Sequence, residues 1–139
     1  MILIDTSGLF AALNVREPDH QAAQEALLRD EWPLILSPFV LAELDYLVRK
    51  RAGRKAALDV LTDVGDGLYE LAPMDTRDVA AARDVIARYA DLDLGLADAS
   101  VVVLADRYGT ERVLTLDQRH FRVVRTPAGR PFTLLPADV

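Results

Sequence analysis

Four acidic residues stand at positions where a charge needs an explanation. Asp5 and Asp117 each lie at the end of a short apolar run that predicts a buried strand. Glu43 and Asp98 lie within helical patterns, and their neighbours one turn away are apolar or aromatic. These neighbours are Phe39, Val40, Tyr46 and Leu47 for Glu43, and Leu94, Val101 and Val102 for Asp98. An acid in such surroundings must be paired, protonated or bound to a cation.

Each of these acids also has a purely structural interpretation when it is taken alone. Asp5 is placed to cap the helix that follows it, and Asp117 is placed to form an Asx turn or a cap. A buried salt bridge would account for Glu43, and the positive end of a helix dipole would favour Asp98. Asp45 lies about 200° around the helix from Glu43 and is interpreted as a surface acid.

The elements that would bring the acids together are predicted from apolar runs, helical periodicity and capping residues. The predicted strands are residues 1–5, 34–36, 68–71, 113–116 and 132–135, with a further short strand at 121–124. The predicted helices are residues 6–14, 19–30, 38–51, 55–64, 76–89 and 95–108. This alternation predicts an α/β fold whose parallel sheet is covered on both faces. In such folds, functional sites form beyond the carboxyl ends of the strands.

Carboxylates gathered at that edge without a counter-charge would repel one another strongly. The sequence has no cysteine and only two histidines, His20 and His120. This composition disfavours a zinc site, since such sites use three or four nitrogen or sulfur ligands. A hard cation such as Mg²⁺ prefers oxygen ligands. It can activate water and neutralise the charge on a phosphodiester.

Basic residues are concentrated in two stretches, although the net charge is −6. The first holds Arg49, Lys50, Arg51, Arg54 and Lys55, and the second holds Arg112, Arg119, Arg122, Arg125 and Arg130. Both are placed to bind the flanking phosphates that an acidic site repels. The alternative interpretation is two solvated faces with no binding role.

Length and composition limit the class of protein. A chain of 139 residues, 51 % of them hydrophobic, fits one compact domain with a substantial core. The first residues lack a basic segment and reach Asp5 too early for a signal peptide. The apolar runs are shorter than the roughly 20 residues that a membrane span needs. We therefore expect a cytoplasmic protein that does not enter a membrane.

The residues that carry this chemistry fall into four motifs, and their order resembles that of PIN-domain nucleases. Within that family the sequence is most similar to the VapC toxins of type II toxin–antitoxin pairs. The resemblance covers essentially the whole chain. The motifs are Ile4-Asp5-Thr6-Ser7, then Ser37-Pro38 with Ala42-Glu43-Leu44, then Gly95-Leu96-Ala97-Asp98-Ala99, and finally Leu114-Thr115-Leu116-Asp117 with His120-Phe121.

The resemblance implies a three-layer α/β/α fold with a central parallel sheet of about five strands, formed by a single PIN domain over residues 1–139. It also implies an endoribonuclease that hydrolyses structured RNA, either tRNA or rRNA, with water activated by Mg²⁺ or Mn²⁺. The implied catalytic residues are Asp5, Glu43, Asp98 and Asp117, with Asp5 and Asp98 as metal ligands.

Further expectations follow from the same resemblance. Thr6, Ser7 and Thr115 would orient the acids or the substrate. Expected partners are an RNA substrate, a cognate antitoxin and a second copy of the chain in a homodimer. The predicted RNA-binding residues are Arg49, Arg51, Arg119 and Arg122. His120 is placed to touch RNA, although a hydrogen-bonded or exposed loop histidine is the commoner case, and His20 is interpreted as a surface residue.

Three rival functions share parts of this pattern. A receiver-type phosphoacceptor domain also has acids at strand ends, but it needs a lysine from a late strand, and the lysines here are Lys50 and Lys55. A haloacid-dehalogenase phosphatase needs a second aspartate where Ser7 stands. A non-catalytic PIN scaffold that only binds RNA would have no need of four uncompensated acids.

Overall fold

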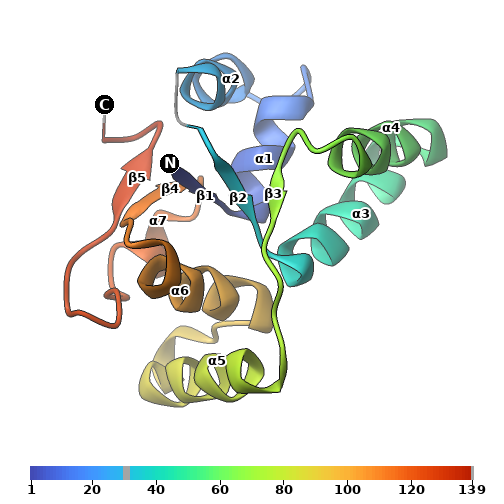
Figure 1. Ribbon diagram of the computed structural model, residues 1–139. Helices are drawn as coiled ribbons and strands as arrows, with labels where there is room; N and C mark the ends of the chain where they lie inside the picture. The colour runs from blue at the N-terminus through green and yellow to red at the C-terminus, as the bar shows by residue number, and fades with distance from the viewer. Residues whose placement is uncertain (30–31, 139) are drawn as a thin grey trace.

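A computed structural model describes residues 1–29 and 32–138 (Figure 1). Within this part of the chain, five parallel strands form one sheet in the order β3-β2-β1-β4-β5. The strands are β1 (Ile2–Ile4), β2 (Leu34–Leu36), β3 (Glu70–Leu71), β4 (Arg112–Leu114) and β5 (Thr133–Leu135). The central strand β1 pairs Ile4 with Leu36 of β2 on one side and with Leu114 of β4 on the other. This register aligns the carboxyl ends of the three inner strands.

The helices cover both faces of the sheet and confirm the three-layer α/β/α expectation. They are α1 (Thr6–Leu13), α2 (His20–Leu28), α3 (Pro38–Ala52), α4 (Arg54–Gly65), α5 (Thr76–Arg88), α6 (Leu96–Tyr108) and α7 (Gln118–Phe121), with the 3₁₀ helix η1 (Ala90–Leu92). Figure 1 shows α5 and α6 on the opposite side of the sheet from α1 and α2. Because both faces are covered, β1 and β2 are apolar and buried at every position.

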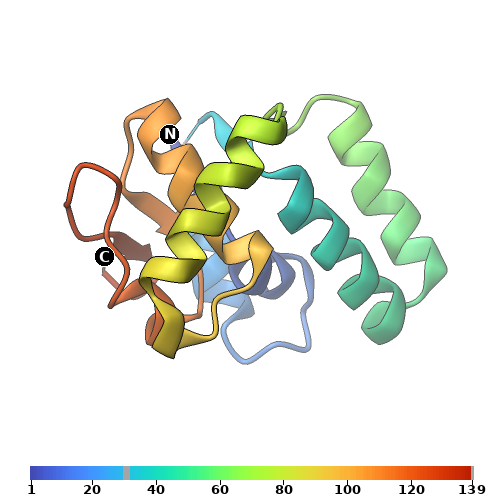
Figure 2. The same ribbon diagram turned by 90° about the horizontal axis from the view of Figure 1, so that it is seen from below.

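In two pairs of helices, the members pack against each other. The α3–α4 pair lies beyond one edge of the sheet, and α5 packs along α6 (Figure 2). The α3 helix also contacts α6, at the edge where β2 ends. This contact is what brings an acid from α3 near an acid from α6.

Capping residues set the starts and ends of these helices as the sequence predicted. Ser37 accepts hydrogen bonds from the backbone N–H groups of Phe39 and Val40, and Pro38 occupies the first position of α3. Asp75 forms a capping box with Asp78 at the start of α5. Gly109 ends α6 with φ of 64°, a conformation that a residue without Cβ adopts freely.

The strand predicted at residues 121–124 is wrong, because the short helix α7 and a turn occupy that region. The Asp117 side chain accepts a hydrogen bond from the His120 backbone and starts the helix. Phe121 and Val124 are both buried, a spacing of three that suits a helical turn rather than a strand. Other elements differ only at their ends, since β4 stops at Leu114 and β3 is two residues long. The predicted end of α2 at Asp30 lies outside the described residues.

The close approach of α1 to β4 depends on Gly8. A Cβ atom at this position would lie only 2.4 Å from the carbonyl oxygen of Leu114. The missing side chain therefore lets the first turn of α1 rest directly on the end of β4. As a result, the residues after β1 and those after β4 become neighbours.

No helix in the described ranges is long and apolar enough to cross a membrane.

Candidate active site

All four predicted acids line one open pocket of about 260 Å³ at the carboxyl ends of β1 and β4. Asp5 follows β1 directly, and Asp117 lies just beyond β4 at the start of α7. Helix α3 contributes Glu43 and Leu47, and the first turn of α6 contributes Asp98. Thr6 and Ser7 complete the lining. The expectation that the strand ends and two helices gather these residues is confirmed by this arrangement.

Asp5 is held in place by hydroxyl groups from two segments. Its side chain is buried, with 2 % of the residue exposed. Oδ2 accepts hydrogen bonds from Thr115 Oγ1 at 2.7 Å and from Ser7 Oγ at 2.9 Å. Each hydroxyl has a single proton to donate, so the 3.2 Å separation of Ser7 Oγ from Thr115 Oγ1 is a contact and no hydrogen bond. The supporting role predicted for Ser7 and Thr115 fits this geometry.

The backbone fixes the direction of both hydroxyl protons. The Leu116 N–H donates to Ser7 Oγ at 3.0 Å, and the Asp117 N–H donates to Thr115 Oγ1 at 2.9 Å. With their acceptor sites filled, the two hydroxyls turn their protons towards Asp5. Burial raises the pKa of the Asp5 carboxyl, and the hydrogen bonds from Thr115 and Ser7 oppose that rise. The network thus favours the ionised form in a place that otherwise disfavours it.

The second oxygen of Asp5 has no such support. Oδ1 is buried and has no hydrogen-bond partner within residues 1–29 and 32–138. Thr6 also lines the pocket, and its buried Oγ1 likewise has no hydrogen-bond partner in the described part of the chain. An unsatisfied buried carboxylate oxygen is costly, of order 1–3 kcal/mol or more. A bound cation would satisfy it.

The ionised form of Asp98 is disfavoured by burial and by its neighbours. Burial raises its pKa to about 7, and the charges of Asp5 and Asp117 raise it as well. His120 and Glu43 also act on it, the first lowering and the second raising the pKa. The side chain is 19 % exposed, so solvent reaches it only partly. Crowding by like charges, which the sequence predicted for this group, is therefore present.

Glu43 does not lie in the apolar environment that its neighbours in the sequence suggested. Val40, Leu44 and Val48 form the buried stripe of α3, whereas Glu43 is exposed. The buried salt bridge considered for Glu43 is therefore wrong. Its helix still points it at the acids, because Glu43 and Leu47 line the pocket together. Glu43 is the acid of the set that faces solvent most openly.

His120 is the residue of this site that the sequence did not single out as part of the acid cluster. Its Nδ1 lies 2.9 Å from Asp117 Oδ2 and 3.3 Å from Asp98 Oδ2. Its backbone N–H donates to Asp117 Oδ1 at 3.0 Å. The signal available in the sequence was the spacing, since a residue three after a helix cap returns to the same side. His20, in contrast, lies away from the acids with Nδ1 2.8 Å from the carbonyl oxygen of Ala11.

A pair of serines joins the two helices that supply Glu43 and Asp98. Ser100 Oγ donates to the carbonyl oxygen of Ala97 at 2.6 Å, which uses its one proton. Ser37 Oγ lies 2.7 Å from Ser100 Oγ and donates to it, while also capping α3. Both serines are fully buried, at 1 % and 0 % exposure. The contact fixes the start of α3 against α6, and no pattern in the sequence indicates that Ser100 takes part.

The predicted RNA-binding arginines fall into two groups. Arg49 pairs with Asp45 at 3.2 Å, and Arg122 pairs with Asp138 at 2.6 Å. Arg51 and Arg119 are exposed, and neither forms an ion pair with another residue that the structure describes. Binding of RNA by any of the four remains a prediction, and the unpaired two are the freer to bind phosphate.

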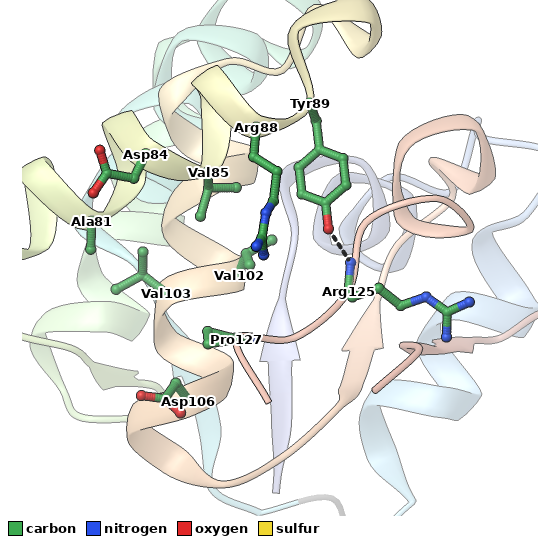
Figure 3. A pocket seen from close by; sticks show the side chains of 10 residues that line it. All are labelled: Ala81, Asp84, Val85, Arg88, Tyr89, Val102, Val103, Asp106, Arg125 and Pro127. Carbon is green, nitrogen blue, oxygen red and sulfur yellow. Dashed lines mark hydrogen bonds between the residues drawn. The ribbon is translucent and has the colours of Figure 1, made fainter. Parts of the chain in front are cut away.

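A second pocket, of about 450 Å³, lies away from the acids between α5, α6 and the loop after α7. Figure 3 shows Arg88 and Tyr89 on one wall and Pro127 on another, with the Arg125 side chain directed away from Arg88. The Tyr89 hydroxyl accepts a hydrogen bond from the Arg125 backbone N–H at 3.1 Å and so holds the loop in place. This pocket has no acid cluster comparable with that around Asp5.

The donors around the acidic pocket suit a hard divalent cation. Asp98, Asp117 and His120 each offer a ligand atom, and these atoms lie within 4.8 Å of one another. The remaining donors are carboxylate and hydroxyl oxygens, the ligand type that Mg²⁺ prefers. The unsatisfied Asp5 Oδ1 and the raised pKa of Asp98 would both be relieved by a positive charge in this pocket.

Comparison with known proteins gives two matches by sequence. A model of the PIN domain family matches residues 2–126. The chain is also 44 % identical over 135 residues to a protein named ribonuclease VapC26 from Mycobacterium tuberculosis strain H37Rv. That alignment covers 97 % of this chain and all of the relative.

Solved structures share the fold at lower sequence identity. Mycobacterium tuberculosis VapC20, described as a sarcin-ricin loop cleaving toxin, superposes with a TM-score of 0.78 at 20 % identity, over 84 % of this chain and 90 % of that one. The DNA-bound VapBC complex of Salmonella typhimurium gives a TM-score of 0.70, also at 20 % identity, over 96 % and 98 % of the two chains.

Proposed function

Since the chain belongs to the PIN-domain family, and within it to the VapC ribonucleases, we propose that it is a Mg²⁺-dependent endoribonuclease and the toxin of a toxin–antitoxin pair. One observation carries this proposal. The buried Oδ1 of Asp5 lacks a partner in the described part of the chain, in a pocket that three further acids line. A folded protein tolerates that arrangement most readily when a cation completes it.

Asp5 and Asp98 are the residues that would hold the cation, because both are largely buried and both have a raised pKa. A divalent cation in this pocket supplies a positive charge that neutralises a phosphodiester and acidifies a water molecule. Mn²⁺ meets the same oxygen-ligand requirement and would substitute.

The other residues of the pocket would have separate tasks. Thr115 and Ser7 hold Oδ2 of Asp5, which leaves Oδ1 as the oxygen without a partner in the described part of the chain. The Asp117 side chain is held in place because its Oδ1 accepts a hydrogen bond from the His120 backbone N–H. Glu43 is exposed and reaches the pocket from α3, which places it to accept the proton of the attacking water.

The proposal includes the substrate and the partners. We propose structured RNA, tRNA or rRNA, as the substrate, supported by the likeness to VapC20, which is described as cleaving the sarcin-ricin loop. A cognate antitoxin is supported by the VapBC complex among the solved structures of the same fold. We further propose that residues 1–139 act as a single PIN domain, in a homodimer and in the cytoplasm, as expected for a toxin of this family.

The test is cleavage of total tRNA and of ribosomes by the purified protein, with mapping of the new RNA ends. Cleavage should require Mg²⁺ or Mn²⁺ and should stop when EDTA is added. The matched control is Asp5→Asn, which removes one charge from the pocket and should leave RNA intact in either metal. Undiminished cleavage by a metal-free sample would exclude the mechanism.

A further inference from the structure

The exposed side of α3 connects the acidic pocket to the first basic stretch. Glu43 and Leu47 line the pocket. Tyr46 lies one helical turn after Glu43, and Lys50 lies seven residues after it, about 20° off around the helix. These side chains therefore form a continuous strip that starts at the acids and runs towards the carboxyl end of the helix.

Tyr46 is an aromatic ring that the fold does not use. Its residue is 58 % exposed, while the core of α3 is made by Val40, Leu44 and Val48. Among residues 1–29 and 32–138, the ring interacts with Lys50, whose Nζ lies over it at 5.8 Å from the ring centroid. A cation over one face of a ring at that distance interacts with the π-electrons, and more than half of the residue still stays exposed.

The charge along this strip is also arranged for an anion. Arg49 is already paired with Asp45 on the other side of the helix. Lys50 and Arg51 have no carboxylate within ion-pair distance among residues 1–29 and 32–138. An aromatic ring with an unpaired cation over one face, one turn from an acidic pocket, suits a nucleotide whose base stacks on the other face while its phosphate meets the cation.

We infer that Tyr46 is a stacking platform for an unpaired base of the RNA next to the cleaved phosphodiester, with Lys50 binding the adjacent phosphate. The inference rests on the proposed ribonuclease function and adds the form of the substrate to it. A base can lie on the ring only where it is unstacked from its neighbours. The site therefore selects loops and single strands over continuous duplex.

The test measures RNA affinity in the Asp5→Asn background, so that the probe is not cleaved. The probes are a fluorescently labelled RNA hairpin with an unpaired purine-rich loop and a fully paired duplex of the same composition. Tyr46→Ala should weaken hairpin binding about 5- to 150-fold, as expected when one base loses an aromatic partner. Tyr46→Phe keeps the ring and should bind like the parent. The matched control is Leu58→Ala, an exposed apolar residue of α4 at 48 % exposure.

A third probe, the hairpin with abasic sites in its loop, separates stacking from other contacts. Tyr46→Ala should have little effect on this probe, because there is no base to lose. Equal affinity of Tyr46→Ala and its parent for the intact hairpin would overturn the inference, as would an equal loss for hairpin and duplex. A loss of affinity for a partner protein alone would overturn it too. If the parent binds no RNA and the wild type cleaves none, the proposed function itself fails, and that result is distinct from these.

Discussion

The two sides of the acidic pocket are built in opposite ways. On the strand side, Asp5 is buried and its Oδ2 is held by Thr115 and Ser7, whose hydroxyls are in turn fixed by backbone N–H groups. On the α3 side, Glu43 is exposed, and Tyr46 beyond it is more than half exposed. Acids of both sides face the same space.

The difference separates two requirements of a nuclease site. A cation needs ligands whose positions do not change, and the ends of β1 and β4 would provide them for the proposed cation, although their negative charges are crowded. A large RNA needs an accessible surface, and an exposed helix provides that. We therefore expect substitutions on the strand side to alter cation affinity and stability, and those on the α3 side to alter substrate binding.

The largest effect is expected from Asp98→Asn, which should abolish RNA cleavage. In the metal-free protein, the same change should leave the melting temperature level or raise it, because it relieves burial of a charge and repulsion by Asp5 and Asp117. The folded state holds the Asp98 proton until about pH 7, while the unfolded chain releases it near the ordinary pKa of 3.8. Rising pH through this window therefore destabilises the wild type. The advantage of Asp98→Asn should grow over the same range.

Thermal unfolding in EDTA across that pH range, with cleavage assays alongside, checks this prediction. The alternative is that Asp98 forms a buried ion pair with His120, whose Nδ1 is 3.3 Å away. Loss of one partner of such a pair costs roughly 3–5 kcal/mol. A large fall in the melting temperature of Asp98→Asn would favour that alternative. His120→Ala should then destabilise the protein to a similar extent.

The fold and the acids were predictable from the sequence because their signals are local. Short apolar runs ending at Asp5 and Asp117 mark strands that stop at one edge of the sheet, and the structure confirms both. Ser37 with Pro38 likewise marks the start of α3. Such signals depend on residues within a few positions of each other, and they survive whatever the rest of the chain does.

The features that the sequence did not reveal depend on contacts across the fold. The link between Ser37 and Ser100 joins residues 63 positions apart, and the contact of Gly8 with the Leu114 backbone joins β4 to α1. Glu43 is exposed despite its apolar neighbours, because neighbours one turn away do not specify which side of a helix meets the core. For the strand predicted at 121–124, the Asp117 cap and the burial of Phe121 favoured helix α7 instead.

A smaller effect is expected from Thr115→Val, which removes a hydroxyl of the strand side with little change in shape. Asp5 Oδ2 then loses its 2.7 Å hydrogen bond, and the Asp117 N–H loses its acceptor. We expect cation affinity to fall about 10- to 100-fold, the usual cost of removing a residue that orients a metal ligand. Titration calorimetry with Mn²⁺ measures this directly. Thr115→Ser keeps the hydroxyl and should behave like the wild type.

Leu47→Ala provides the matched control from the other side of the pocket. Leu47 is half-buried and lines the same space, but it makes no polar contact with the acids. Its substitution should leave Mn²⁺ affinity close to that of the wild type. Equal losses for Thr115→Val and Leu47→Ala would mean that the two sides do not differ in the way the structure suggests.

The smallest effects are expected from the arginines predicted to bind RNA, and they extend the comparison beyond the pocket. Phosphate contacts carry no base identity, so their loss should weaken binding of all RNA sequences alike. Replacing Arg49 and Arg51 together, or Arg119 and Arg122 together, with alanine should reduce the slope of log affinity against log salt by about one for each lost contact. The site of cleavage should stay the same, because the pocket and the RNA shape determine it.

Single variants sharpen this expectation, because each pair contains one arginine with a partner and one without. Arg51 and Arg119 are the unpaired members in the described ranges, so Arg51→Ala and Arg119→Ala should account for most of the change in slope. Arg122 donates to Asp138, whose Oδ2 also accepts the Leu134 N–H at the end of the sheet. Arg122→Ala should therefore act mainly on the stability of the C-terminal segment.

The measurement is the RNA affinity of each variant in the Asp5→Asn background across a salt series, which shows which arginines contact phosphate. An unchanged slope for both Arg51→Ala and Arg119→Ala would identify these residues as solvated surface or as contacts for an antitoxin.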